Sequence, residues 1–389
     1  LFVGHAVDEA LVIVGRQRGH PDDLAIARAH RDGDAGDDRL AAVLQRLLVG
    51  ELDAFLQGVG DLLLEIAVDR LQGFIPPERQ ILCTGEKYRR QIQRVLPEFV
   101  DERILGEPEG RDTLAAVGLP AAVAMREDAD AIIGVFTADH LIEPVEQFQR
   151  RVEVGYELAE KHPNTLVTFG IEPAYAATGF GYVELGRPLE GFDQAYRAVR
   201  FVEKPDARTA EQYVASGRYA WNSGMFVWRA ATLLSCIERY KPEVHAGLMR
   251  IAAAWTTPER QRVLEQVYPR LEKISVDFAV MEPASADEAV AVATVAMPLQ
   301  WLDVGSWTAY GEILAADAEG NRLGGGRAVL LDSANNLLVS EDPGHLVAAV
   351  GIEDLVVVHT PRVTMICRRD QAQRIKELYQ AVEQRGELQ

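Results

Sequence analysis

Residues 201–228 read FVEKPDARTAEQYVASGRYAWNSGMFVW, and their first part has the pattern of a strand that ends in charged residues. An apolar start leads to Glu203 and Lys204, and Pro205 follows them. Because proline has no amide hydrogen for a sheet ladder, we expect the strand to end there. A carboxylate and an ammonium group would then lie at the carboxyl edge of the strand, where open α/β sheets bind ligands. The alternative is a surface ion pair.

The second part of this stretch, WNSGMFVW at residues 221–228, predicts a return of the chain to the core. Asn222 precedes Gly224, and the apolar, aromatic run that follows is typical of a strand. The side-chain amide of Asn222 can both donate and accept hydrogen bonds. Together with the charged pair at residues 203–204 it predicts the floor of a small polar pocket. An ordinary asparagine turn is the alternative.

The size and composition of the chain limit its class. Its 389 residues, 48% of them hydrophobic and 25% charged, suffice for a large core and an appended module or second domain. A formal net charge of −19 argues against nucleic acid as a partner, because a nucleic-acid scaffold needs a basic face. No apolar run reaches the roughly 20 residues that span a bilayer, so no membrane partner is expected. Three widely spaced cysteines (Cys83, Cys236, Cys367) are typical of a reduced, cytoplasmic protein.

Residues 61–310 alternate between helical and strand patterns. This rhythm is typical of an α/β fold, with a mainly parallel sheet covered by helices on both faces. Helices are predicted at residues 62–74 and 87–96, and strands at residues 80–84, 131–136 and 165–171.

From residue 311 to residue 389 the pattern changes to short, apolar strands separated by turn residues. We expect a small β-rich, β-helix-like module that is closed by a charged helix at residues 371–385. The predicted strands are residues 328–332, 337–340, 346–350, 355–359 and 364–367.

Residues 1–60 form an atypical N-terminal segment. A buried strand is predicted at residues 10–15, and a basic turn at residues 16–19 follows it. Such a turn can hold a phosphate, but without a GxGxxG or GxxxxGK[ST] frame an ordinary turn is the stronger alternative. An acidic, Gly-rich loop at residues 31–39 and an amphipathic helix at residues 40–56 complete the segment.

Two aspartates stand beside predicted strands. Asp139 follows an apolar strand in the sequence TADH, where a carboxylate can hold a Mg²⁺ ion that bridges phosphates. The same position would suit a helix N-cap. Asp303 lies in WLDVGSW at residues 301–307, and the alternative for it is a turn between two core tryptophans.

The loop EPEGRDT at residues 107–113 combines a permissive backbone with polar side chains. Gly110 permits a tight turn, and Arg111 can contact a phosphate. Asp112 and Thr113 complete the loop.

Two other segments leave the choice between structure and function open. ATGFGYVE at residues 177–184 contains Gly179 and Gly181, and it predicts either a loop against a ligand or a Gly-rich hairpin turn. Asp277 in SVDFAVME at residues 275–282 either orients a polar neighbour or caps a helix, and the cap is the favoured interpretation.

The segments FVEKPD, WNSGMF, SVDFAVME and WLDVGSW resemble, in this order, the signature segments of mannose-1-phosphate guanylyltransferases. These enzymes belong to the sugar-nucleotide pyrophosphorylases. The resemblance extends from about residue 62 to the C-terminus. It implies a Rossmann-like nucleotidyltransferase domain followed by the β-rich module. The implied reaction transfers GMP from GTP to mannose 1-phosphate and gives GDP-mannose and pyrophosphate.

The resemblance also implies roles for single residues. Asp139 and Asp303 would together hold Mg²⁺, and Lys204 would neutralise the sugar phosphate, which makes these three the catalytic candidates. Glu203 and Asn222 would contact the hexose.

The remaining implied contacts are with backbone and loops. Gly224 would lie at the substrate, and the loop that contains Gly179 and Gly181 would lie against the sugar. The loop with Gly110, Arg111, Asp112 and Thr113 would contact the nucleotide. Asp112 stands where the family usually has asparagine, which adds negative charge near the triphosphate.

One feature of the family has no match in this sequence. The family has a Gly-rich loop with an arginine and then a lysine after its first strand, and this loop wraps the triphosphate. Nothing in residues 1–60 matches it. The alternative function is therefore a pyrophosphorylase-like protein that binds sugar phosphate or nucleotide sugar without turnover. A homodimer is compatible with either function.

Overall fold

The computed structural model describes residues 11–16, 63–304, 307–312, 314–340, 342, 344–361 and 363–385. For residues 11–16 this description is limited to the backbone. The predicted loop at residues 31–39 and the predicted helix at residues 40–56 lie outside the described residues, as does the basic turn beyond Arg16. No helix in the described part of the chain is long and apolar enough to cross a membrane.

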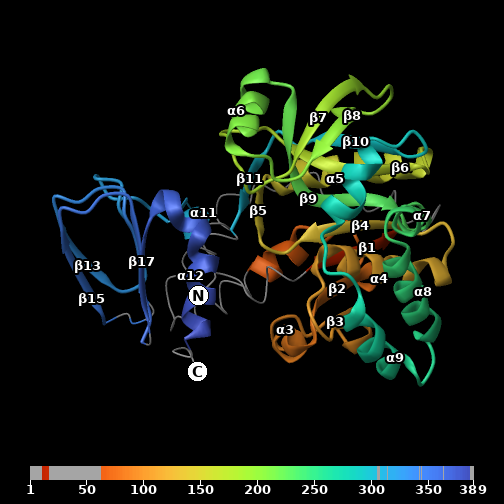
Figure 1. Cartoon of the computed structure of the whole chain (residues 1–389), viewed down its shortest axis with the longest axis horizontal. Coiled ribbons are helices and arrows are strands. Elements are labelled where there is room, and N and C mark those ends of the chain that lie inside the picture. The colour runs from red at the N-terminus through yellow and green to blue at the C-terminus, as the bar shows by residue number, and fades with distance from the viewer. Residues whose placement is uncertain are drawn as a thin grey trace.

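A nine-stranded sheet forms the centre of the described chain (Figure 1). Its strand order is β3-β2-β1-β4-β9-β6-β10-β8-β7. The strands are β1 (Leu11–Arg16), β2 (Gln80–Gly85), β3 (Ile104–Glu107), β4 (Ile132–Thr137), β6 (Thr165–Ile171), β7 (Tyr182–Pro188), β8 (Ala195–Val202), β9 (Tyr219–Arg229) and β10 (Ala291–Ala296).

The expectation of a mainly parallel sheet is wrong for most of its ladders. Only β2–β3 and β6–β10 pair in parallel among the described strands of this sheet. β1, β8 and β9 run opposite to their neighbours and pair antiparallel with them. The sheet is therefore mixed. Strand patterns report burial on each face and carry no information about direction, which explains the difference.

Helices cover both faces of the sheet, as expected for an α/β fold. Along β9, Met225 and Val227 belong to one hydrophobic core, whereas Phe226 and Trp228 belong to the other. This alternation follows from the two-residue period of a strand. α5 packs on the first face, and α4, α7 and α8 pack together on the second.

Residues 63–69 are helical, and ten further α-helices of the described chain carry labels. They are α3 (Arg89–Val95), α4 (Asp112–Glu127), α5 (Val145–Lys161), α6 (Ala207–Ser216), α7 (Ala230–Tyr240), α8 (Pro242–Ala254), α9 (Arg260–Val267), α10 (Glu282–Ser285), α11 (Trp307–Glu312) and α12 (Ile375–Gln384).

Residues 201–228 run from the end of β8 to β9, which is the central strand of this sheet. β8 ends at Val202, so Glu203 and Lys204 follow a strand end as predicted. Asn222, however, lies inside the eleven-residue strand β9 and not in a turn. Gly224 has a left-handed backbone with φ +70°, and the β6–β9 register shifts nearby. A bulge at this glycine, rather than a chain reversal, explains the WNSG sequence.

A short antiparallel ribbon lies beside the large sheet. β5 (His140–Glu143) pairs with β11 (Gln300–Asp303), and Asp303 lies directly opposite His140. The ribbon therefore joins segments that are far apart in the sequence.

The C-terminal module confirms the five predicted strands and adds β12. Its strands stack in parallel as β12–β14–β16 and β13–β15, while β17 pairs antiparallel with β16. Figure 1 shows this module at one end of the molecule, with α12 beside it. The strands are β12 (Arg322–Gly324), β13 (Arg327–Leu331), β14 (Leu337–Ser340), β15 (Leu346–Val350), β16 (Leu355–His359) and β17 (Thr364–Arg368).

A buried asparagine links successive turns of the module. The Asn336 amide donates to Asn321 Oδ1 at 2.9 Å and to the Ile352 carbonyl at 3.0 Å. Its Oδ1 accepts from the Leu355 amide at 3.0 Å. Because Asn336 is 1% exposed, these bonds satisfy groups that water does not reach.

The Asn336→Ala variant should lower the free energy of unfolding of the module by about 2–4 kcal/mol, because it leaves buried polar groups without partners. Hydrogen exchange of the β14 and β16 amides would measure this. Asn335→Gly is the matched control. Asn335 is exposed and has φ +55°, a conformation that glycine adopts without strain. The Asn335→Gly substitution should therefore change the free energy of unfolding by less than about 1 kcal/mol. Equal loss of protection in both variants would contradict the role assigned to Asn336.

Candidate active site

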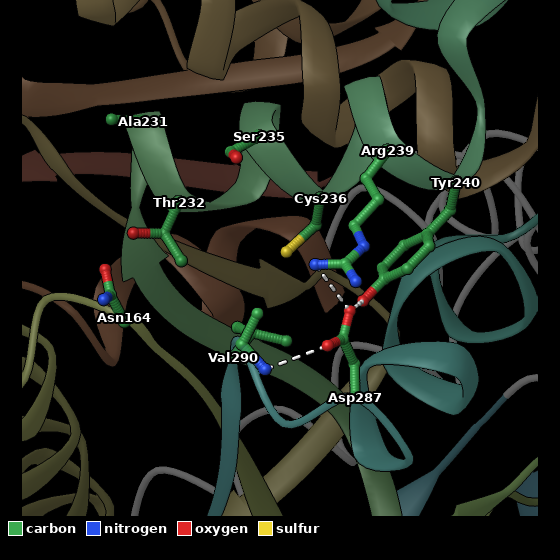
Figure 2. A pocket seen from close by; sticks show the side chains of 10 residues that line it. Asn164, Ala231, Thr232, Ser235, Cys236, Arg239, Tyr240, Asp287 and Val290 are labelled. Atoms are coloured by element: carbon green, nitrogen blue, oxygen red, sulfur yellow. Dashed lines mark hydrogen bonds and ion pairs between the residues drawn. The ribbon is translucent and has the colours of Figure 1, made fainter.

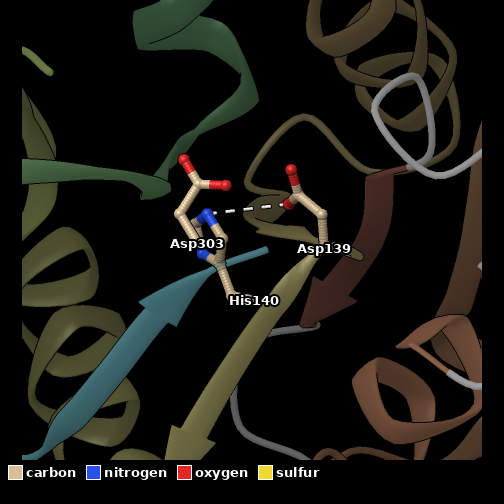
Figure 3. A group of neighbouring side chains, drawn as sticks. All are labelled: Asp139, His140 and Asp303. Carbon is tan, nitrogen blue, oxygen red and sulfur yellow. Dashed lines mark ion pairs between the residues drawn. The ribbon is translucent and has the colours of Figure 1, made fainter. Parts of the chain in front are cut away.

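The ribbon brings the two predicted metal-binding aspartates together. Asp139 directly precedes β5, and Asp303 ends β11. The Val304 amide donates to the Asp139 carbonyl at 3.0 Å, which fixes the two strands beside each other. Ligand atoms of Asp139, His140 and Asp303 all lie within 4.8 Å of one another, and Figure 3 shows both carboxylates on the same side of the ribbon.

His140 has the structure of an orienting residue. Its ring is 4% exposed, and Nδ1 lies 3.2 Å from Trp301 Nε1. Because an indole N–H can only donate, Nδ1 accepts, and the ring proton is placed on Nε2. Nε2 lies 3.6 Å from Asp139 Oδ1. Burial, and secondarily the positive charge of Arg70, hold the pKa of His140 well below its usual value, so the ring is neutral.

Arg70 supports this cluster from behind, and the sequence analysis missed it. Its guanidinium donates to the carbonyl of His140 at 2.9 Å and to the carbonyl of Thr137. The residue is 2% exposed, and burial lowers its pKa to about 10 although Asp139 opposes this shift. The available signal was a lone arginine within the apolar helix predicted at residues 62–74.

The acid pair has the chemistry of a magnesium site. Mg²⁺ prefers oxygen ligands and is usually bound by one or two carboxylates together with phosphate oxygens. Asp139 and Asp303 offer such oxygens at one point. The protonated Nε2 of His140 offers no lone pair there, so the donor set is the two carboxylates.

A second group of polar residues contains those from which the sequence predicts a pocket. Lys204 has a left-handed backbone with φ +45°, and its Nζ lies 3.4 Å from Glu203 Oε1. Asn222 Nδ2 donates to Asp277 Oδ1 at 2.8 Å. The pocket therefore contains an ammonium group, an amide and two carboxylates.

Asp277 is a correction to the sequence analysis, which favoured a helix cap. It is the first residue of a π-helix, Asp277–Met281, and the hydroxyl that accepts from an amide of its first turn belongs to Ser275, at 3.3 Å from the Phe278 nitrogen. Its carboxylate instead orients Asn222. Single turns of π-helix are rare and often accompany functional sites, because they redirect a side chain.

Burial makes the two carboxyls of this pocket weak acids. Burial, and then the charge of Asp277, raise the pKa of Glu203 to about 7. Burial also raises the pKa of Asp277 to about 6. The positive charge of Lys204 opposes both shifts without cancelling them.

The predicted glycines differ in what they contribute. The carbonyl of Gly181 accepts a hydrogen bond from the backbone amide of Asn222 at 2.8 Å. A side chain at position 181 would collide with the Glu203 carboxylate. Gly224 provides the left-handed backbone of the β9 bulge. Gly179 has open space around its Cα, so no packing requires glycine there.

Aromatic rings connect the acid pair with the pocket. Trp301 packs against His140 with 5.0 Å between ring centroids, and Phe180 packs against Trp301 at 5.3 Å. Phe180 also packs against Trp221, the neighbour of Asn222, at 5.2 Å. These rings thus form a continuous apolar contact from His140, beside the acid pair, to Trp221 on β9.

The loop at residues 107–113 lies next to Asp277. Thr113 Oγ1 accepts from the Val276 amide at 2.9 Å. Asp112 has φ +64° and accepts from the Thr113 amide at 2.7 Å. Asparagine and aspartate are the non-glycine residues that most readily adopt this left-handed conformation, which explains why either residue fits.

Arg111 in the same loop contacts protein groups. Its guanidinium donates to the Pro269 carbonyl and lies 3.1 Å from Glu109 Oε1. Gly110, directly before it, is partly exposed. Binding a phosphate through Arg111 would therefore use the donors that these contacts leave.

The N-terminal strand confirms one prediction. β1 forms where residues 10–15 predicted a strand. It runs antiparallel to β4, with Leu11 opposite Thr137 and Arg16 opposite Ile132. Arg16 therefore lies at the edge of the sheet away from Asp139. The basic turn predicted at residues 16–19 continues beyond the described residues, so its proposed contact with a phosphate stays a prediction.

A cavity of about 340 Å³ lies at that other edge, between α7 and the segment before β10 (Figure 2). There the Tyr240 hydroxyl donates to Asp287 Oδ2 at 2.6 Å, and Arg239 lies 3.1 Å from the same oxygen. These groups neutralise one another. The cavity also lacks a second carboxylate among the residues that line it, so the acid pair and the pocket at the opposite edge are the better candidate site.

Family models and known relatives identify the family of this chain. Residues 77–320 match the nucleotidyl transferase family, and residues 326–382 match the MannoseP isomerase/GMP-like β-helix domain. The Escherichia coli K12 mannose-1-phosphate guanylyltransferase is 36% identical over 85% of this chain and 69% of its own length. The Klebsiella pneumoniae mannose-1-phosphate guanylyltransferase is 34% identical over 83% of this chain and 67% of its own length.

A solved structure is similar in the same region. The crystal structure of a mannose-1-phosphate geranyltransferase from Thermus thermophilus is 34% identical and has a TM-score of 0.68. The match covers 83% of this chain and 90% of that one. The chain belongs to the nucleotidyl transferase family, among relatives of the mannose-1-phosphate guanylyltransferases.

Proposed function

We propose that this chain is a mannose-1-phosphate guanylyltransferase, which transfers GMP from GTP to mannose 1-phosphate and releases pyrophosphate. The observation that carries the proposal is the convergence of Asp139 and Asp303 within 4.8 Å, next to a pocket with an ammonium group and an amide. Relatives that bear this name cover most of the chain.

The proposed chemistry is a single in-line displacement. A phosphate oxygen of mannose 1-phosphate attacks the α-phosphorus of GTP and forms a new P–O bond. The bond from that phosphorus to the bridging oxygen of the β-phosphate breaks, and pyrophosphate leaves with the electron pair. Because the attacking phosphate is already ionised, no general base is required. The protein has to position two anions and balance their charge.

The pocket residues would do this for the sugar phosphate. Lys204 would hold its phosphate as a compact positive charge. Glu203 and Asn222 would bind hydroxyls of the hexose. The loop at residues 110–113 would contact the nucleotide.

Mg²⁺ would be held by the carboxylates of Asp139 and Asp303. When bound, it would neutralise phosphate charge that develops during the displacement. Two carboxylates at this distance repel one another without a cation, which supports the assignment.

The second candidate function is binding of sugar phosphate or nucleotide sugar without turnover. The direction of β1 favours it, because this strand leads the chain away from Asp139. Loss of a preorganised phosphate clamp costs several kcal/mol of transition-state stabilisation.

The proposal includes a cytoplasmic location and a homodimer. The free thiols of Cys83, Cys236 and Cys367 support a reduced compartment. Exposed apolar side chains on β13 and β15 offer a face for a second copy. A monomeric mass in light scattering would remove the dimer from the proposal. The exposed apolar side chains on β13 and β15 are Val329, Leu331, Leu346 and Val350.

The Asp139→Asn variant should lower pyrophosphate release from GTP, mannose 1-phosphate and Mg²⁺ by about 100-fold or more, because the acid pair loses one charged ligand. Excess Mg²⁺ should restore part of the rate. Asp193→Asn is the matched control, since Asp193 is 75% exposed and pairs only with Arg151 among the ion pairs of the described chain. An active Asp139→Asn variant would refute the metal role. A wild-type chain that binds mannose 1-phosphate but releases no pyrophosphate would establish the second candidate function.

The Glu203→Gln variant should change how stability depends on pH. The pKa of Glu203 is raised to about 7 in the folded protein, so its ionisation opposes folding as pH rises from the unfolded pKa of about 4.5 to about 7. Relative to wild type, the variant should gain roughly 2–3 kcal/mol in free energy of unfolding between pH 4.5 and pH 8. Denaturant titrations at both pH values would measure it. A difference that does not change with pH would contradict the assigned burial of the charge.

A further inference from the structure

The side-chain amide of Asn222 is held from two sides. Thr168, in the middle of β6 and 0% exposed, donates its hydroxyl to Asn222 Oδ1 at 2.6 Å. On the other side, Asn222 Nδ2 donates to Asp277 Oδ1 at 2.8 Å. Three segments that are distant in the sequence therefore meet at one amide.

The two contacts favour the same orientation of that amide. An asparagine side chain can turn over and exchange its carbonyl oxygen with its amino group. An ionised carboxylate can only accept hydrogen bonds, so Asp277 requires the amino group on its side. The carbonyl oxygen then faces Thr168, whose hydroxyl can donate to it. The other acceptor near this hydroxyl is the Met225 carbonyl at 3.2 Å.

This orientation determines what Asn222 offers to a ligand. Its Oδ1 is engaged by Thr168, and one of its two N–H groups is engaged by Asp277. The second N–H group is a donor that no described contact of the side chain uses. Asn222 therefore presents a donor, not an acceptor.

Glu203 presents the complementary group beside it. Its Oε2 is buried and has no hydrogen-bond partner among the described residues. A Cβ placed on Gly181 would touch both this oxygen and the Asn222 side chain, at 3.4 Å from the Asn222 Cβ. The unpartnered oxygen therefore lies close to the Asn222 side chain, and glycine at position 181 leaves room for the Glu203 carboxylate there.

We propose that Thr168 and Asp277 are positioning residues that lock the Asn222 amide, so that Asn222 and Glu203 recognise a neighbouring pair of sugar hydroxyls. One hydroxyl accepts from Asn222 Nδ2, and the other donates to Glu203 Oε2. This inference rests on the proposed function for the identity of the sugar. The hydrogen-bond network itself does not depend on that function.

The kinetic test compares two substitutions of Thr168. Thr168→Val keeps the shape of the side chain and removes the hydroxyl, so the KM for mannose 1-phosphate should rise about tenfold. The KM for GTP and kcat should stay within about twofold, because the nucleotide loop and the acid pair are untouched. Thr168→Ser keeps the hydroxyl and should restore the KM to within about threefold of wild type. An equal rise of both KM values, or no rise with Val, would overturn the proposal.

The spectroscopic test does not need activity. The chain has five asparagines (Asn164, Asn222, Asn321, Asn335, Asn336), so asparagine-selective ¹⁵N labelling gives five side-chain amide pairs. The pair missing in Asn222→Asp identifies Asn222. Its wild-type hydrogens should exchange slowly, and Thr168→Val or Asp277→Asn should shift the pair and speed its exchange. The other four wild-type pairs report whether the variants remain folded, and Asp277→Asn adds a sixth pair from the substituted residue.

The two tests separate the possible failures. If the wild-type chain neither binds nor converts mannose 1-phosphate, the proposed function fails, while the amide spectrum still decides whether the lock exists. An Asn222 amide with the same shift and exchange rate in Thr168→Val and wild type would overturn the inference. A changed amide without any change in mannose 1-phosphate binding, measured by calorimetry on a binding-competent chain, would also overturn it, because the lock would then have no role in recognition.

Discussion

The ladder between β5 and β11 is the constraint on which the candidate site depends. It places Asp303 opposite His140, and so beside Asp139. Two carboxylates at one point repel each other, so an isolated ribbon would open. Arg70 opposes this opening, because its buried guanidinium donates hydrogen bonds to the carbonyls of Thr137 and His140 on both sides of Asp139. Its positive charge also attracts the Asp139 carboxylate. The fold thus holds an anionic pair in place and leaves a position at which a cation gains binding energy.

The β9 bulge performs the corresponding task for the second half of the site. A regular strand would direct residues alternately into the two cores, as Met225 to Trp228 show. The bulge at Gly224 keeps this alternation, because Trp221 before it lies in the same core as Met225 and Val227 after it. Asn222 remains in the ladder, with its backbone amide bonded to the Gly181 carbonyl, and its side chain meets Asp277. The polar side chains of Thr168, Asn222 and Asp277 would be costly inside the protein, and their mutual hydrogen bonds offset that cost.

The sequence predicted the parts of the site that follow strand ends, and it failed where tertiary contacts decide. The position of Asp139 after β4 and of Glu203 after β8 could be predicted, because apolar runs end visibly. The strands of the C-terminal module could be predicted for the same reason. The role of Asp277 and the burial of Arg70 could not, since an aspartate at a helix start and an arginine in an apolar helix each have common local explanations. Strand direction also leaves no local pattern, so the mixed sheet was not predicted.

Strand direction is what limits the nucleotide half of the site. β2, β3, β4 and β6 all point their carboxyl ends toward one edge, and loops that leave this edge can converge on a ligand. β1 enters the sheet between β2 and β4 in the opposite direction, so Leu11 lies at that edge and Arg16 at the other. Arg16 therefore lies at the edge opposite to Asp139. Among the described segments, the loop at residues 110–113 leaves β3 at the correct edge and is joined to the pocket through Thr113 and Val276. Any activation of GTP by this chain must then depend more on that loop and the acid pair than on the strand β1.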